Sequence, residues 1–258
     1  AMALSHYPQA ESGMTSAQTL ADKLAAEEAA EQARRELAEA RSAANDQLAS
    51  LLAKIDAQSF AAADLAKSAE HAASAVQQVV GNVAPTVEQL TALTQQLAAD
   101  TLLTESQRQG YTDRLTAMKT ETSRLSAQLD TTATALAAIT KEIVDLQRSC
   151  EAATQEQQRL QQLVDGAQSK AEVEQQQTAL DKLAADIATL TDDVSAATQT
   201  LATLTDTSAA TGALATLNTQ LTTLTTEVTN AIAQAKLDDE ARKALAEAQR
   251  MAQLRYKT

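Results

Sequence analysis

The sequence predicts an all-α protein, an elongated antiparallel helical bundle whose helices pack like coiled coils. Its apolar residues recur at alternating steps of four and three along most of the chain, which is the heptad pattern of helices that bury one narrow stripe. Only five glycines and two prolines are present, there is no Trp, and Phe60 is the one Phe. A compact α/β or all-β domain needs frequent turns and aromatic core residues, which this composition does not supply.

The most regular apolar stripe, or seam, runs from about Leu115 to Asp165. Its members are Leu125, Leu129, Thr132, Leu136, Ile139, Ile143, Leu146, Cys150 and Ala153. Thr104 and Gln107 form a capping box at the start of this helix. Asp165-Gly166 is the sharpest turn signal in the chain. A helix over about 104–165 is therefore predicted, and Gly110 should not end it.

The first predicted helix covers about 16–80, after a flexible lead-in at residues 1–14. Glu27–Arg41 is rich in charge, which indicates a solvated face. The seam follows in Leu37, Ala44, Leu48, Leu51, Ile55, Ala62, Leu65, Ala69, Ala72, Val76 and Val79. Several members are alanine, so these layers bury little area.

Gly81–Pro85 is the best candidate for a break in the first half of the chain. The heptad frame nevertheless continues through Val83, Leu90 and Leu97, so a kinked but continuing helix is the alternative. We favour the break, which leaves a short helix over about 86–99.

The third long helix is predicted over about 169–235, capped by Ser169 and Glu172. Its seam contains Leu180, Leu183, Ile187, Leu190, Val194, Ala197, Leu201 and Leu204, and then Leu214, Leu217, Leu221, Leu224, Val228 and Ala231. The register slips within 205–213, either as a stutter in one helix or as a loop. We expect the stutter, followed by a short last helix over about 238–254.

The three long helices would have matching lengths, roughly 90–100 Å at 1.5 Å per residue. Such lengths favour an up-down-up bundle, with the short helices 86–99 and 238–254 together at one end. Residues 15–258 would then form a single elongated bundle.

Composition excludes several classes of function. The net charge of −13 and pI near 4.6 argue against binding of nucleic acid. His6 and His71 are far apart, Cys150 has no partner cysteine, and no phosphate-binding loop or nucleophile motif is present. We therefore expect no catalytic, cofactor-binding or metal-binding residues, no small-molecule substrate, and a protein that is not an enzyme.

No signal peptide or transmembrane helix is visible, which fits either a cytoplasmic protein or one exported by a non-classical route. Residues 71–87 and 207–226 lack charges but are too polar to span a bilayer. Membrane contact would require residues 76–103 to rearrange.

These observations favour a non-enzymatic structural or interaction protein, a helical rod acting as a scaffold or assembly subunit. A protein partner or self-association is expected, with exposed seam surface on the short helices as the docking face. The layout of sixty-residue helices with a smaller head also resembles the cytolysin A and haemolysin BL type of α-helical pore-forming toxin. That resemblance implies a secreted, oligomer-forming accessory component. The alanine-, glutamine- and threonine-rich composition is similar to that of flagellin-like and phasin-like proteins.

Overall fold

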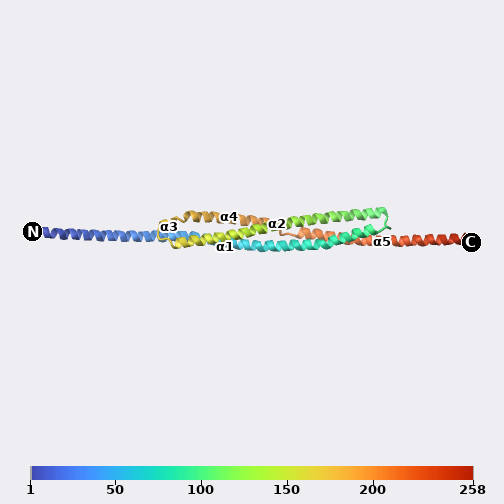
Figure 1. The fold of residues 1–258 in the computed structure, drawn as a ribbon, viewed down its shortest axis with the longest axis horizontal. Coiled ribbons are helices and arrows are strands. Elements are labelled where there is room, and N and C mark those ends of the chain that lie inside the picture. Colours follow the sequence, from blue (N-terminus) through green and yellow to red (C-terminus); the bar gives the residue numbers. More distant parts are fainter. Residues whose placement is uncertain (1, 258) are drawn as a thin grey trace. The chain divides into compact units, whose positions relative to one another are not determined.

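The computed structural model describes the backbone of residues 2–257 and the side chains of residue 13 and residues 15–257. Over this range the chain is helical and contains no strand, so the all-α prediction is confirmed. Figure 1 shows the helices, which are α1 (Met2–Ala99), α2 (Glu105–Asp165), α3 (Lys170–Glu174), α4 (Gln177–Ala202) and α5 (Ser208–Lys257).

The chain divides into two compact units, and α1 and α2 each contribute to both. Unit 1 contains α1 up to Leu65 together with Glu142–Ala197. Unit 2 contains Ala66–Lys141 and the chain from Thr198 onward. Each unit is a bundle in which segments of three long helices bury their seams.

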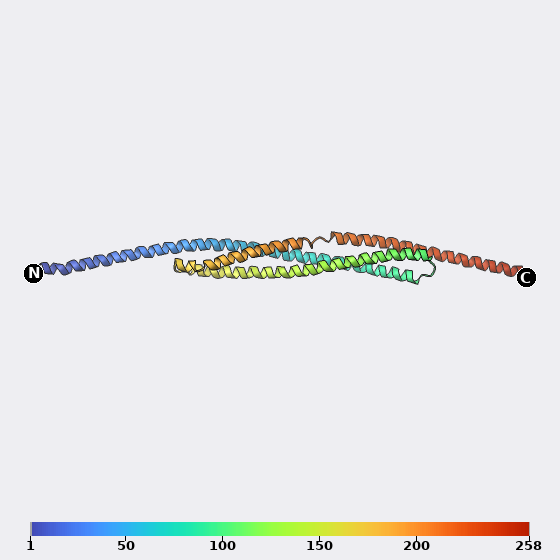
Figure 2. The same cartoon turned by 90° about the horizontal axis from the view of Figure 1, so that it is seen from above.

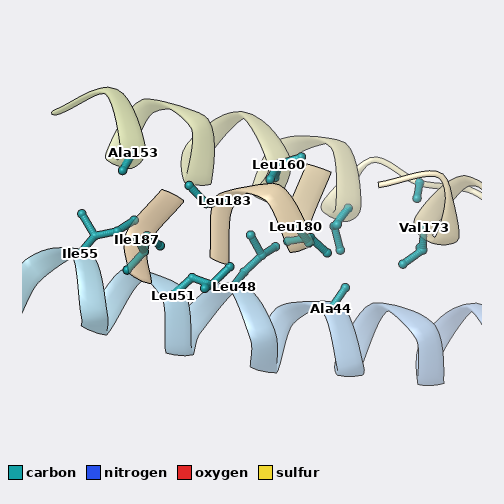
Figure 3. Packing of buried hydrophobic residues seen from close by; sticks show 12 residues of the cluster. Ala44, Leu48, Leu51, Ile55, Ala153, Leu160, Val173, Leu180, Leu183 and Ile187 are labelled. Carbon is teal, nitrogen blue, oxygen red and sulfur yellow. The ribbon is translucent and has the colours of Figure 1, made fainter. Parts of the chain in front are cut away.

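The core of unit 1 is formed by α1, α2 and α4, with Val173 of α3 at one end (Figure 3). Most of the buried residues belong to the predicted seams, whereas Leu160, Val164, Ala167 and Val173 extend them beyond the residues that were predicted. The buried residues are Ala44, Leu48, Leu51, Ile55, Ala153, Leu160, Val164, Ala167, Val173, Leu180, Leu183 and Ile187. Leucine and isoleucine supply most of the buried apolar area, which is the main stabilising term of such a bundle.

Polar side chains also connect the helices of unit 1. The side-chain amide of Gln157, which lies in the seam of α2 and is buried, donates to the carbonyl of Leu48 at 3.3 Å. Gln161 donates to Asn45 at 2.8 Å. Arg41 donates to the carbonyl of Ala167 at the turn after α2. These bonds fix the register of α1 against α2.

Unit 2 repeats the arrangement with α1, α2 and α5. Its buried seam residues include Ala69, Val76, Val83, Leu90 and Leu97 of α1, Leu115, Leu125, Leu129, Leu136 and Ile139 of α2, and Leu214, Leu217, Leu221, Leu224 and Val228 of α5. Buried Thr86 of α1 donates to Asn218 of α5 at 2.6 Å. Arg114 of α2 forms an exposed ion pair with Glu227 of α5.

The predicted capping box at Thr104 and the predicted cap at Ser169 are both confirmed. At the start of α2 the Thr104 hydroxyl accepts from the Gln107 N–H at 3.1 Å, and the Gln107 side chain accepts from the Thr104 N–H at 3.1 Å. At the start of α3 the Ser169 side chain accepts from the Glu172 N–H at 3.2 Å. Local capping of this kind determines where a helix starts. Gly110 lies inside α2, as predicted.

The predicted break at Gly81–Pro85 is wrong, because α1 continues through it (Figure 2). No glycine of the described backbone has a positive φ, so Gly81 does not end the helix. Val83 and Thr86 are buried in the bundle on either side of Pro85. Their packing offsets the loss of one backbone hydrogen bond, which costs about 3 kcal/mol in a helix interior.

The predicted stutter at 205–213 is also wrong, because α4 ends at Ala202 and α5 begins at Ser208 (Figure 2). At this loop, side chains form hydrogen bonds with backbone groups. The Thr203 hydroxyl donates to the carbonyl of Thr200 at 2.7 Å, and Asp206 accepts from the Ser208 N–H at 2.9 Å. The hydrogen bonds from Ser208 lower the pKa of Asp206. The change of heptad register therefore occurs at a loop between α4 and α5.

The predicted set of three helices of about sixty residues with two short ones is therefore corrected. α1 has 98 residues and takes in both 16–80 and 86–99. α2 has 61 residues and matches 104–165. The predicted helix 169–235 is divided among α3, α4 and α5, and 238–254 is part of α5, which has 50 residues. The expected flexibility of residues 1–14 stays a prediction.

Candidate interaction surfaces

The described side chains contain no group of three or more His, Cys, Asp or Glu placed to hold a metal ion. His71 is exposed beside buried Ala72, and His6 lies outside the residues whose side chains are described. Cys150 is buried in the seam of α2, where burial raises the pKa of its thiol. A thiol held in its neutral form packs as a small apolar side chain.

A shallow groove follows α2 and α4 within unit 1. Small residues at Ala152 and Ala153 leave it open beside Leu183. Its rim is acidic, and Glu156 there pairs with Arg159, which lowers the pKa of the Glu156 carboxyl. The groove is a packing gap between helices with a solvated rim.

No helix among the described residues is both long enough and apolar enough to cross a bilayer. Residues 76–99 lie in α1, where Val76, Val79 and Leu93 are buried, and the turn to α2 follows. The segment expected to form a separate head is thus part of the bundle of unit 2. Its rearrangement on a membrane stays a prediction.

The most distinctive surface of unit 1 is the N-terminal end of α1. Every side chain from Thr15 to Arg35 is exposed. In Figures 1 and 2 the blue end of α1 extends past the other helices of unit 1. Leu20 and Leu24, one turn apart, are 59% and 53% exposed. We call residues 15–35 the free end of α1.

The seam of unit 1 extends into this free end as a row of alanines. Ala26, Ala30 and Ala33 continue the four-three spacing of Leu37, Ala40 and Ala44. A hollow lies between Ala30, Ala33 and Leu37 on one side and the turn at 168–171 on the other. The seam is thus still present where the other two helices of the bundle have ended.

Unit 2 has a corresponding feature in the C-terminal end of α5. All side chains from Glu240 to Lys257 are exposed, and this red end has no helix beside it in Figures 1 and 2. Large apolar side chains remain in contact with solvent there, namely Leu237, Leu245, Met251, Leu254 and Tyr256. We call residues 236–257 the free end of α5.

Sequence reasoning located one of these surfaces and missed the other. The predicted docking face on 238–254 lies in the free end of α5, whereas 86–99 is packed inside unit 2. The free end of α1 was assigned to the bundle. One feature of the sequence indicates that this end is uncovered. Residues 25–36 contain no leucine, isoleucine or valine, so only alanine occupies the seam positions there.

No protein family, curated protein or solved structure matches this chain. The fold therefore defines only a class, an all-α helical bundle protein with two exposed helix ends.

Proposed function

We propose that this chain is a non-enzymatic structural protein, a helical rod that acts as a scaffold or assembly subunit through protein–protein contacts. The observation that carries the proposal is that two helices continue beyond their bundles as free ends with exposed apolar side chains. The buried seam residues in the core of unit 1 pack against one another, so those residues are already used for folding.

Exposed apolar residues on the free end of α5 are spaced for helix packing. Leu237, Ala241, Ala244, Ala248 and Met251 follow one another at alternating steps of four and three. Such a stripe fits a second helix laid along it. The partner we propose is therefore helical and presents an apolar stripe of its own.

An isolated helix of about twenty residues is marginal in water, because most helical stability in proteins comes from packing of an apolar face. A partner that covers either free end would thus stabilise it. This makes the free ends better candidates for a docking function than the closed surfaces of the bundles.

The test is chemical cross-linking and affinity capture with the purified chain as bait, followed by mapping of the cross-links. Two bait variants place charge on the exposed large apolar side chains of the free ends, Leu20→Asp with Leu24→Asp and Leu245→Asp with Met251→Asp. Phe60→Asp is the matched control, because Phe60 is 72% exposed on α1 within a bundle. Capture should be lost with the end variants and retained with the control.

A chain that stays a monomer and recovers no protein, or capture that the end variants leave unchanged, would contradict the proposal. The same preparation tests the alternative of an accessory component of a pore-forming toxin. Leakage of liposomes or red cells, with or without the products of neighbouring genes, would replace the scaffold proposal by that one.

A further inference from the structure

The first part of α1 in unit 2 buries a seam of small side chains. No leucine or isoleucine occurs between Leu65 and Leu90. The buried members of the seam over this stretch are alanine, valine and threonine, namely Ala69, Ala72, Val76, Val79, Val83 and Thr86. Small side chains bury less apolar area than leucine does, and this area is the main stabilising term of a bundle. Residues 69–86, which we call the small-seam segment, are therefore held less strongly than the leucine-rich stretch that follows.

Two residues of the small-seam segment also weaken the helix itself. Gly81 is exposed, no glycine of the described backbone has a positive φ, and no neighbouring atom lies within 4 Å of a Cβ added to Gly81. Alanine would fit there without strain and would stabilise the helix. Pro85 lacks the backbone N–H that would bond to the carbonyl of Gly81 in a regular helix. Neither a turn nor close packing requires glycine at position 81.

Side-chain bonds hold the end of α1 but not the small-seam segment. The structure describes every side chain of residues 69–85, and none of them forms a hydrogen bond or an ion pair. Residues 71–87 also contain no Asp, Glu, Lys or Arg that could pair along the helix. Further on, the guanidinium of Arg108 donates to the carbonyls of Leu97 and Asp100. The turn at the end of α1 is therefore fixed, whereas the segment before it depends on its small seam alone.

The neighbouring helix α5 begins only partway along this segment. Thr86 of α1 donates to Asn218 of α5 at 2.6 Å, and Gln96 donates to Thr229 at 3.5 Å. The partners of these two bonds are 132 and 133 residues apart in the chain, so the two helices run in the same direction with a constant offset. The start of α5 is thus level with about residue 76, and the loop before α5 is level with the start of the small-seam segment. That part of α1 has a loop in place of a helix on one side.

We propose that the small-seam segment of α1 is a built-in opening site, which unfolds locally and recloses while the rest of the bundle stays packed. Such local openings occur where few apolar contacts and few side-chain bonds hold the backbone. Opening exposes Val76, Val79 and Val83 in a stretch without charge. These valines then form an apolar surface that the closed bundle conceals. The inference concerns unit 2 and does not depend on the free ends.

The experiment is native-state hydrogen exchange of the full chain at increasing urea concentration. Amides of residues 72–86 should exchange about a hundredfold faster than those around Leu48 and Leu93, after correction for intrinsic rates. Their rates should respond weakly to urea below the unfolding transition, because a local opening exposes little surface. Unfolding of the whole unit would instead give the same strong urea dependence at every seam amide.

Two substitutions should keep the small-seam segment closed. Gly81→Ala should slow the exchange of residues 72–86 by about fivefold, because alanine loses less backbone entropy than glycine does. Pro85→Ala should slow it by about tenfold or more, since alanine restores the missing N–H donor. Both positions are exposed, so neither change alters the buried seam, and exchange around Leu48 should stay the same.

Gly110→Ala is the matched control. Gly110 is an exposed glycine inside α2 and belongs to unit 2 as well. No neighbouring atom lies within 4 Å of a Cβ added there. The substitution gives the same gain in helix propensity outside the small-seam segment. It should therefore leave the exchange of residues 72–86 unchanged.

Amides of residues 72–86 that exchange as slowly as those around Leu48 overturn the inference. Equal slowing of these amides by Gly110→Ala and Gly81→Ala also overturns it, because unit 2 would then open as a whole. Exchange that Pro85→Ala leaves unaltered would contradict the role given to the missing hydrogen bond, and with it the opening site.

Discussion

The two parts of α1 in unit 1 form the same helix but are stabilised in different ways. From Ala44 to Leu65 the seam is buried against α2 and α4. From Thr15 to Arg35 every side chain is exposed, and the helix depends on its alanine-rich composition and on continuity with the packed part. A helix-forming sequence therefore does not by itself indicate that a bundle is present, and helix and bundle end at different residues.

The largest effect expected from this comparison is that of a charge placed in the seam. Ile187→Asp would bury an unpaired carboxylate and should destabilise unit 1 by about 4 kcal/mol or more. Ile143→Asp on α2 should act in the same way. The measurement is thermal and urea unfolding followed by circular dichroism.

Leu245→Asp is the matched control, because it makes a similar chemical change on the free end of α5, where Leu245 is 60% exposed. The melting of this variant should equal that of the parent chain. Equal melting of Ile187→Asp and the parent would show that the seam had been misassigned.

A smaller effect of opposite sign is expected at Gln157, which is a buried polar residue in the seam of α2. Its bond to Leu48 is long, at 3.3 Å, and a carbonyl inside a helix also accepts from the backbone. Gln157→Leu should therefore stabilise unit 1 by about 1 kcal/mol. Urea unfolding measures the change.

Gln161→Leu controls for this substitution, since Gln161 is half-buried and bonds to both Asn45 and Asp165. It should give no gain in stability. A loss of stability in Gln157→Leu would mean that the bond to α1 contributes more than the apolar burial that replaces it.

A still smaller effect is expected at the exposed pair that links α2 and α5. The hydrogen bond from Arg114 lowers the pKa of the Glu227 carboxyl below its ordinary value. The stabilisation is therefore present above the pKa of the unfolded chain, near 4.3, and is lost as the pH falls through the lower pKa of the folded state. Glu227→Gln should reduce stability slightly at pH 7 and not at low pH.

Urea unfolding of this variant and the parent at pH 7 and pH 3 measures that difference. Glu240→Gln, a change on the free end of α5, is the control and should leave the pH dependence unaltered. A Glu227→Gln chain with the full pH dependence of the parent would show that the pair contributes nothing.

The smallest effect is expected within the free end of α1. Glu28 is exposed and touches no bundle, so Glu28→Ala should change the free energy of unfolding by less than about 0.5 kcal/mol. Melting of the parent and the variant checks this. A clear fall in melting temperature would indicate that the free end packs against its own chain.

Much of the bundle could be predicted from sequence, because a seam is a local pattern. Spacing alone identifies Leu125, Ile143 and Ile187, and the capping box at Thr104 and the cap at Ser169 are encoded in four residues each. The continuity of α1 at Pro85 could not be predicted, because it depends on packing of neighbouring residues against other helices. A change of register likewise fits a stutter or a loop equally well until the backbone partners are known.

The free ends were the least predictable feature. Helix propensity is a property of the segment itself, whereas coverage by a neighbour depends on where the other helices stop. Ala26, Ala30 and Ala33 keep the seam spacing whether or not a second helix lies on them. Only the ends of α2 and α4 reveal that neither of these helices covers the alanines.

Hydrogen exchange of the full chain tests the account most directly. Seam amides, such as those around Leu48 and Leu221, should exchange slowly. Amides of residues 15–35 and 240–257 should exchange much faster, because their side chains are exposed and no bundle core includes them. Ends that are as protected as the seams would contradict the claim that these helices continue beyond their bundles.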